Sequence, residues 1–507
     1  MSSASIAALV QDAGAKYADA EAVVDGERRV SFAELAALVR HGAAFCVSRG
    51  VQPGERVAVW APNSLEWIIA ALGAVSAGAA LVPLNTRFKG DEAAYILDKS
   101  RAALTFVAPP FLGNDYAAML RQSVRGDREG VVTLDESLWD LDVPAEIDER
   151  IASLGPDDIG DVIFTSGTTG RPKGVVTTHA QTLRVFDTWS EVVGLAEGDR
   201  YLVVNPFFHT FGYKAGIIAC LLRGAAIVPQ PVFDVPEVLS LIGSERISVL
   251  PGPPTLYQSI LDARDPSHDL SSLRLAVTGA AVVPVALVER MRSDLGCETV
   301  LTAYGLTEAT GTVTMCRRDD DAETIATTSG RAIPDTEVRV VDRAGKPVAS
   351  GEPGEVVVRG YNVMQGYFED AEATAQAIDA DGWLHTGDIG VLDERGNLRI
   401  TDRLKDMYVV GGFNAYPAEI EQVLATHPSI AEAAVVGVAD ERLGEVGRAF
   451  VVARPGESVD PDEVVAFCKE RMANYKVPRS VEVVDALPRN ASGKVLKFEL
   501  RQGTAAR

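Results

Sequence analysis

The sequence predicts an α/β protein with a large N-terminal domain built on parallel sheets, a small antiparallel barrel and a small α+β domain at the C-terminus. Three observations predict this organisation. The chain has 507 residues, more than a single hydrophobic core usually serves. Short β-branched runs alternate with helical patterns from about residue 20 to residue 330, as in parallel sheets covered on both faces. After Gly330, apolar and polar residues alternate between glycine-rich turns, which is typical of antiparallel sheet.

The first part of the chain is predicted to begin with a helix. Residues 1–14 lack a basic region followed by an apolar core, so an amphipathic helix is expected there rather than a signal peptide. The longest apolar stretch, Ile68–Pro83, is short for a bilayer span. We expect a buried helix over Glu66–Gly78 that turns into a strand over Ala79–Pro83. Further strands are predicted at 57–61, 104–108, 161–167, 201–206, 225–230, 247–252 and 273–280.

The antiparallel subdomain is expected at about 330–402, with strands at 336–342, 354–360 and 396–401. Beyond it the pattern predicts helices at 418–427 and 461–472 and strands at 433–439, 449–455 and 480–485. This tail of about a hundred residues is large enough to fold as a domain. The sequence therefore predicts an N-terminal domain over 1–402 and a C-terminal domain over 403–507.

The composition narrows the classes of partner. Acidic residues outnumber basic ones by 71 to 48, for a formal net charge of −23, so nucleic acid is an unfavourable partner. A phosphate-bearing ligand would need a local site of backbone N–H groups and a few cations. The five cysteines include no C-x-x-C pair, which argues against structural zinc and a disulfide framework and favours a reducing cytoplasm.

One loop has the chemistry of a phosphate site. TSGTTGRPKG follows the strand DVIF; its glycines let backbone N–H groups approach a ligand, its hydroxyls donate hydrogen bonds, and its lysine supplies charge. It is not a Walker A loop, because glycine rather than serine or threonine follows the lysine. By composition alone a surface turn is the alternative. The candidate phosphate-binding residues are Thr165, Ser166, Gly167, Thr168, Thr169, Gly170 and Lys173.

The whole loop also matches a family signature, and four further motifs follow in that family's order. They are YGLTE at Tyr304–Glu308, TGD at Thr386–Asp388, DRLKD at Asp402–Asp406 and PRNASGK at Pro488–Lys494. The chain thus resembles, over nearly its whole length, the adenylate-forming superfamily of acyl-CoA synthetases, luciferases and peptide-synthetase adenylation domains. The resemblance implies ATP, Mg²⁺ and coenzyme A, two parallel-rich sandwiched sheets, a small antiparallel barrel and a mobile α+β C-terminal domain.

The resemblance also implies roles for residues around the nucleotide. Tyr304 would stack on the adenine, Thr307 would contact the phosphates and Glu308 would hold Mg²⁺, a cation that prefers oxygen ligands. Asp388 would accept hydrogen bonds from the ribose hydroxyls, and Arg403 would reach the ribose or a phosphate. Judged singly, Asp388 and Arg403 are also consistent with a turn residue and a surface cation. The other side of the base would be lined by Gly279, Ala280 and Ala281.

Lys494 is the expected catalytic residue of adenylation, together with Glu308 and Thr307. Attack of a carboxylate on the α-phosphate gathers negative charge, so a positioned ammonium stabilises the transition state more than the ground state. Family members rotate the C-terminal domain between the two half-reactions; the hinge position here is Lys405. The resemblance places Gly411 and Gly412 along the pantetheine tunnel of coenzyme A, with a plain β-turn as the alternative.

The acid pocket is expected in PFFHTFGYKAG, residues 206–216, which lacks the aspartate that peptide-synthetase domains place there for an amino group. No carrier domain follows Lys494, so an amino acid substrate is disfavoured. Lys214 is unusual in this apolar segment: it would meet a carbonyl or carboxylate at the far end of the acid, or reach solvent. The predicted pocket residues are Phe208, His209, Phe211, Lys214 and Gly305, with Tyr213 adding to the apolar wall.

Stretches such as NPFFHTFGYKAGI and ITDRLKDMYVVGGFNAYPAE resemble, more narrowly, actinobacterial CoA ligases that activate a bicyclic steroid-derived propanoate (HIP). We therefore expect a cytoplasmic, AMP-forming acid–CoA ligase of steroid catabolism. A medium-chain or aryl acid–CoA ligase, an acyl-AMP ligase that loads a carrier protein, and a nucleotide-binding protein without ligase activity are the alternatives. A small carboxylic acid is the expected partner, and a homodimer is allowed; neither nucleic acid nor a membrane span is expected.

Overall fold

The computed structural model describes residues 3–123, 126, 129–165, 172–279, 283–404, 406–410, 413–440, 442–472, 474–489 and 495–502. It divides into two compact units. The first comprises Met1–Val338 with Val358–Leu384, and the second comprises Arg339–Val357 with His385–Arg507. The division passes through the antiparallel sheet that follows Gly330, and the domain boundary at residue 402 stays a prediction.

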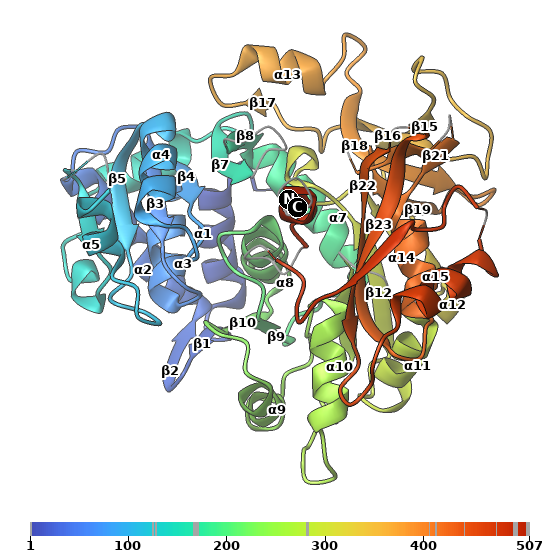
Figure 1. Ribbon diagram of the computed structural model, residues 1–507. Helices are drawn as coiled ribbons and strands as arrows, with labels where there is room; N and C mark the ends of the chain where they lie inside the picture. Colours follow the sequence, from blue (N-terminus) through green and yellow to red (C-terminus); the bar gives the residue numbers. More distant parts are fainter. Residues whose placement is uncertain are drawn as a thin grey trace. The chain divides into compact units, whose positions relative to one another are not determined.

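The largest sheet of the first unit has seven strands in the order β17-β8-β7-β4-β3-β5-β6 (Figure 1). Its strands from β7 to β6 run parallel, whereas β8 is antiparallel to β7 and β17 is antiparallel to β8. The central strand β4 is buried at every position, as expected of a sheet covered on both faces. The bounds are β3 Arg56–Trp60, β4 Ala80–Pro83, β5 Ala102–Val107, β6 Val131–Thr133, β7 Ile159–Thr165, β8 Lys173–Thr178 and β17 Gly366–Tyr367.

Two four-stranded sheets also belong to this unit, in the orders β2-β1-β10-β9 and β11-β12-β13-β14. Val249 forms parallel bridges to Tyr201 and to Leu275 and so lies between the two sheets. The prediction of a strand at 247–252 is therefore wrong except for the two bridges that Val249 forms. The bounds are β1 Glu21–Asp25, β2 Arg28–Ser31, β9 Arg200–Val203, β10 Ala226–Pro229, β11 Leu275–Thr278, β12 Thr299–Tyr304, β13 Thr314–Met315 and β14 Arg331–Ala332.

The helices of the first unit include the predicted N-terminal helix, which Ser5 caps by accepting from the amide of Ala8. Figure 1 shows α2 beside α3, next to β3. All of α3 except Glu66 is buried, so the apolar stretch Ile68–Pro83 belongs to the core. The α-helices are α1 Ile6–Tyr17, α2 Phe32–Ser48, α3 Leu65–Ser76, α4 Gly90–Ser100, α5 Tyr116–Arg121, α6 Glu146–Ser153, α7 His179–Val193, α8 Ala219–Arg223, α9 Val235–Ser244, α10 Pro254–Ala263, α11 Val285–Ser293, α12 Ala322–Thr327 and α13 Ala371–Ala377.

Three helices of other types belong to the same unit. They are the 3₁₀ helices η1 Glu136–Trp139 and η3 Thr307–Ala309, and the π-helix η2 Phe211–Ile218. A π-helix is rare and is found disproportionately at functional sites. Within the described ranges, no helix combines the length and the apolar character needed to cross a membrane.

The antiparallel strands after residue 330 form a curled half-barrel in the order β15-β16-β18-β19 rather than a closed barrel. The second unit also holds a five-stranded sheet, in which β21, β20, β23 and β22 are neighbours and β24 pairs with β23. The bounds are β15 Thr336–Val341, β16 Gly354–Gly360, β18 Leu384–Leu392, β19 Leu398–Arg403, β20 Tyr408–Val410, β21 Phe413–Ala415, β22 Ile430–Asp440, β23 Gly444–Ala453 and β24 Ser480–Val483.

Helices pack on the five-stranded sheet around a core of its own. Ile420 and Leu424 of α14 and Val464 of α15 are wholly buried against Val435 of the sheet. The helices are α14 Pro417–Ala425, α15 Pro461–Lys469 and α16 Lys497–Gln502. The predicted α/β class, with parallel-rich N-terminal sheets and an α+β C-terminal part, is therefore confirmed.

Candidate functional site

The predicted phosphate loop connects two antiparallel strands of the first unit. Thr165 ends β7 and lies opposite Lys173, which begins β8. The two residues therefore mark where the loop leaves the sheet and where it returns. The predicted residues within the loop, Ser166, Gly167, Thr168, Thr169 and Gly170, lie outside the described residues.

A carboxylate from a distant segment lies at the loop end of the hairpin that β7 and β8 form. Glu308 is in the short helix η3, directly after β12. The hydroxyl of Thr165 donates to Glu308 Oε1 at 3.4 Å, and the hydroxyl of Tyr367 donates to the same oxygen at 3.1 Å. The ammonium of Lys173 lies 5.0 Å from the centre of the Tyr367 ring. The structure thus brings together the predicted phosphate and metal residues Thr165, Lys173 and Glu308.

Tyr367 is a residue of this site that the sequence analysis missed. Burial raises the pKa of its phenol well above the ordinary value, and the neighbouring Glu308 carboxylate raises that pKa further. The phenol therefore stays protonated and donates to the carboxylate. The sequence gives little sign of this role, because nothing around Gly366–Tyr367 indicates which partner the tyrosine hydroxyl would meet.

The turn that carries Glu308 is held by close backbone contacts and hydrogen bonds. A Cβ atom on Gly305 would lie 2.0 Å from the carbonyl oxygen of Gly311, so only glycine fits there. The amide of Met364 donates to the carbonyl of Glu308 at 2.9 Å, and the hydroxyl of Thr310 donates to the carbonyl of Asn362 at 2.7 Å. These contacts fix the segment from Tyr304 to Thr312 against residues 362–364, which lead into the strand that bears Tyr367.

The predicted adenine residues lie at the ends of two paired strands. Gly279 follows β11 and Tyr304 ends β12, its parallel neighbour. A Cβ atom on Gly279 would approach the carbonyl oxygen of Ala303 to 3.2 Å, so the two segments are in close contact. Stacking on a base stays a prediction, and Ala280 and Ala281 lie outside the described residues.

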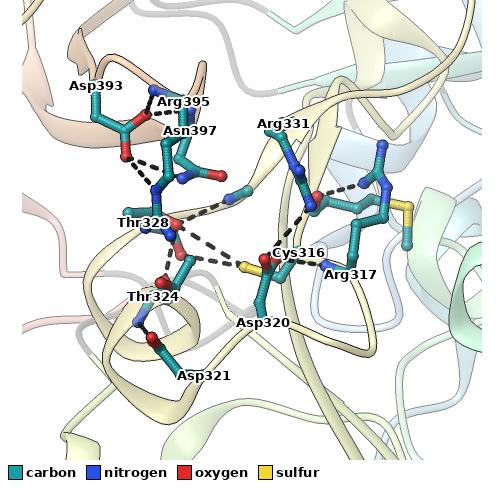
Figure 2. Close-up of polar contacts among 12 residues, drawn as sticks. Cys316, Arg317, Asp320, Asp321, Thr324, Thr328, Arg331, Asp393, Arg395 and Asn397 are labelled. Atoms are coloured by element: carbon teal, nitrogen blue, oxygen red, sulfur yellow. Dashed lines mark hydrogen bonds and ion pairs between the residues drawn. The ribbon is translucent and has the colours of Figure 1, made fainter.

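Polar contacts fasten the segment that follows β13 (Figure 2). The backbone amide of Arg317 donates to Asp320 at 2.7 Å, and the guanidinium of Arg331 lies 3.4 Å from the same carboxylate. Asp321 caps α12, and the hydroxyl of Thr328 donates to the carbonyl of Thr324 at 2.8 Å near its end. These contacts support β13 and β14, which pair next to the strand that presents Tyr304.

The predicted acid segment combines buried and accessible aromatic residues. Phe207 is buried and packs on Trp67, with ring centroids 5.1 Å apart. Phe208 and Phe211 are half-buried and His209 is exposed. Tyr213 is wholly buried, and its place in an apolar wall of the pocket stays a prediction.

Lys214 is buried in the same segment, with 1% of its side chain exposed. Its ammonium lies 2.9 Å from Asp161 Oδ2 and donates to the hydroxyl of Thr177 at 2.8 Å. The alternative that Lys214 reaches solvent is therefore wrong. A direct contact of Lys214 with the acid stays a prediction, and its ammonium already has two partners.

In the second unit, Asp388 lies on β18 opposite Arg403 of β19. The amide of Asp388 donates to the hydroxyl of Thr386 at 3.1 Å. The turn of this hairpin is held by Asp393, whose carboxylate accepts from the amides of Arg395 and Asn397 at 2.8 Å (Figure 2). The side chain of Arg403 and the predicted residues Lys405, Gly411, Gly412 and Lys494 lie outside the described residues.

The oxygen atoms around Glu308 fit the ion that the sequence predicts. A carboxylate with two hydroxyl neighbours offers hard oxygen ligands, and Mg²⁺ is usually bound by one or two carboxylates together with substrate phosphates and water. The described part of the chain has no group of three or more His, Cys, Asp or Glu side chains that could form a complete metal cage. Glu308 would therefore contribute one ligand beside those of a nucleotide.

Known proteins resemble this chain over nearly its whole length. Two similar proteins are CoA ligases for a 7a-methyl-1,5-dioxo-octahydroindenyl propanoate. The one from Rhodococcus jostii is 55% identical over 97% of each chain, and the one from Mycobacterium tuberculosis is 54% identical over 96% of each. A feruloyl-CoA synthase from Amycolatopsis is 38% identical over 95% of this chain and 96% of its own.

Solved structures extend the likeness to the fold. ATP-bound MatB from Rhodopseudomonas palustris superimposes with a TM-score of 0.86 at 30% identity over 99% of each chain. MenE from Bacillus subtilis, an o-succinylbenzoate CoA synthetase in complex with its acyl-adenylate intermediate, gives 0.83 at 29% identity over 97% of each. The AMP-binding enzyme family matches residues 10–368, and its C-terminal domain matches residues 419–494. The chain therefore belongs to the AMP-binding, adenylate-forming enzyme family.

Proposed function

We propose that this protein is an ATP-dependent acid–CoA ligase. It joins a carboxylic acid to the α-phosphate of ATP, releases pyrophosphate, and passes the acyl group from AMP to the thiol of coenzyme A. The observation that carries the proposal is the 55% identity to a CoA ligase over 97% of both chains. The meeting of Thr165 and Glu308 at the mouth of the predicted phosphate loop supports it.

In the proposed first half-reaction, the phosphates of ATP lie along the loop between Thr165 and Lys173. Backbone N–H groups and hydroxyls of the loop bind the phosphate oxygens, and Lys173 offsets their charge. Glu308, oriented by Tyr367, would hold a bound Mg²⁺, which neutralises charge on the phosphates. Lys494 would stabilise the charge that develops as the carboxylate attacks.

In the proposed second half-reaction, the C-terminal domain of residues 403–507 turns about Lys405. Gly411 and Gly412 then line the approach of the pantetheine thiol, since a bare backbone leaves room for it. Asp388 and Arg403 hold the ribose and phosphate of the adenylate. Attack by the thiolate on the acyl carbon breaks the bond to AMP, and AMP leaves as the second product.

The proposed substrate is a bicyclic steroid-derived propanoate (HIP), because two relatives with more than half of their residues identical are named for that propanoyl group. An aryl acid is the second candidate, since a feruloyl-CoA synthase is 38% identical. A cytoplasmic location is proposed as well, because all five cysteines are free and buried. Light scattering would test the homodimer that the sequence allows.

The decisive experiment assays pyrophosphate release and thioester formation for a panel of bicyclic, aryl and medium-chain acids, with and without coenzyme A. We expect the bicyclic propanoate to have the highest kcat/KM and its thioester to form only with coenzyme A present. Adenylate that accumulates with coenzyme A would instead indicate transfer to a carrier protein. Failure of all three classes to give thioesters would sink the ligase proposal.

A further inference from the structure

The first unit contains a closed polar network in its core. Lys214, Asp161 and Thr177 are all buried, with side-chain exposures of 1% for Lys214 and 0% for Asp161. The ammonium lies 2.9 Å from Asp161 Oδ2 and donates to the Thr177 hydroxyl at 2.8 Å, which in turn donates to Asp161 Oδ1 at 2.7 Å. Each of the three groups thus contacts the other two.

The network joins two parts of the first unit. One is the phosphate hairpin, formed by β7 and β8 and carrying the predicted phosphate loop; the other is the acid segment, residues 206–216. Asp161 of β7 and Thr177 of β8 lie opposite each other, four positions along the sheet from the pair Thr165–Lys173 at the loop. At about 3.3 Å per residue, the network lies roughly 13 Å from the loop end of the hairpin. Lys214 comes from the π-helix η2, the continuation of the acid segment.

A second anchor holds the other end of the acid segment. The side-chain amide of Asn63 donates to the carbonyls of Val203 and Asn205 at 3.0 Å, and its oxygen accepts from the amide of Phe207 at 2.7 Å. Between Phe207 and the π-helix lie the accessible residues Phe208 and His209. The segment expected to contact the acid is therefore held at two points, by Asn63 just before α3 and by the phosphate hairpin.

A third contact ties the same segment to the turn that carries Glu308. Gly311 has φ +98, and a Cβ atom there would lie 2.3 Å from Cγ2 of Thr210. Residues 208–211 are thus confined by the hairpin, by Asn63 and by the turn. A small shift of η2 would move these residues relative to the predicted nucleotide phosphates.

Stability alone is a weak reason for this ion pair. Burial lowers the pKa of Lys214, and only the Asp161 carboxylate opposes that shift, so the pair bears a large desolvation cost. Apolar residues of similar volume often replace a buried ion pair without loss of stability. Apolar residues cannot supply a directional polar contact between the acid segment and the hairpin.

We propose that Lys214 is a positioning residue, which through Asp161 and Thr177 locks the acid segment to the phosphate hairpin so that the carboxylate meets the α-phosphate in register. The proposal rests on the ligase function proposed above. It replaces a direct contact between Lys214 and the acid by an action through the hairpin. Misplacement of reacting groups by about 1 Å can cost 10²-fold in rate.

The test compares Lys214→Met, which leaves Asp161 unpaired, with Lys214→Met/Asp161→Asn, which removes both charges. The single variant is expected to lose stability and is informative only if it folds. The double variant should fold, because no unpaired charge is left in the core. At a temperature where circular dichroism shows it folded, its kcat for acid-dependent ATP–pyrophosphate exchange should fall at least tenfold, with each KM changed less than threefold.

A control removes another, less buried ion pair of the first unit. Arg274 contacts Asp199 and donates to the carbonyl of Gly194, at the end of α7 away from the hairpin, and Arg274→Met/Asp199→Asn should keep kcat within twofold of wild type. Wild-type kcat in the folded double variant of Lys214 would overturn the positioning role. An equal loss in the control would overturn it too, because the effect would then be general.

Hydrogen exchange gives a readout that needs no activity. Amides of residues 207–211 and 173–178 should exchange faster in the Lys214→Met/Asp161→Asn variant than in wild type, whereas the control should leave them unchanged. Unchanged exchange at 207–211 in the double variant would contradict the proposal. A wild-type protein that adenylates no acid would contradict the ligase function instead, and the exchange result would still decide the positioning role.

Discussion

The two ends of the β7–β8 hairpin differ although they are built from the same two strands. At the base, Asp161 and Thr177 are buried with Lys214, and His179 follows directly in the core. At the loop end, Thr165 and Lys173 are half-buried beside Glu308. One end uses polar groups to hold strands together, and the other leaves polar groups available for a ligand. Changes at the base should therefore alter stability or, through the alignment of the acid segment, the rate, whereas changes at the loop end should alter the rate with little effect on stability.

The largest effect is expected for the proposed catalytic lysine of the C-terminal domain. Lys494→Ala should lower the adenylation rate about 10³-fold, because an ammonium that meets charge only in the transition state is lost. Thioester formation from supplied acyl-AMP should stay within threefold. The two half-reactions are measured separately by pyrophosphate exchange and by AMP release from the adenylate; equal losses in both would contradict alternation of the C-terminal domain.

The next effect concerns stability at the base. Burial lowers the pKa of His179 to about 4, below its ordinary 6.5. Between these values the unfolded chain binds a proton that the folded chain does not, so stability falls as the pH falls from about 6.5 to 4. The loss is about 3 kcal/mol at 1.4 kcal/mol per pKa unit.

Urea unfolding at pH 7, 5.5 and 4.5 measures that loss. His179→Gln keeps an acceptor for the amide of Ile6, which donates to the imidazole at 3.5 Å, but it does not titrate. The difference between wild type and variant should therefore shrink as the pH falls. A constant difference across the three pH values would show that His179 is not held neutral.

At the loop end, Glu308→Gln should lower the adenylation rate about 10²-fold. The Mg²⁺ that offsets the developing charge on the phosphates would lose a protein ligand. The unfolding midpoint should change little, since within the described residues the carboxylate accepts from two hydroxyls and no charged partner. Titration of activity with Mg²⁺ should show a weaker apparent affinity. An unchanged Mg²⁺ dependence would place the ion elsewhere.

The smallest effect is expected for Tyr367→Phe, which removes one hydrogen bond to a charged carboxylate and keeps the ring beside Lys173. Such a bond contributes about 1.5 kcal/mol, or roughly tenfold in rate. Kinetics at saturating acid and ATP would measure it. Tyr95→Phe serves as the control, since that hydroxyl donates at 3.5 Å to the carbonyl of Pro172 rather than to Glu308.

Sequence patterns predicted the strands and helices well where burial dictates residue type, as in Ile68–Pro83. Motifs also indicated Thr165, Lys173 and Glu308 as candidate phosphate and metal residues, and the structure brings them together. Tyr367 was missed because its partner Glu308 is 59 residues away, and the Lys214 network was missed because it spans 37 residues to Thr177. Periodicity reports which face of an element is buried; it does not report which polar side chains meet within the core.

The buried cysteines have a practical consequence for the movement proposed between half-reactions. All five thiols are free and buried, and burial raises the pKa of Cys46 and of Cys297 to about 12. At neutral pH these thiols carry almost no reactive thiolate. A cysteine introduced at an exposed position of each unit should therefore accept a fluorescent dye on an otherwise native background, so that the separation of the two units can be followed during turnover without first removing the natural cysteines.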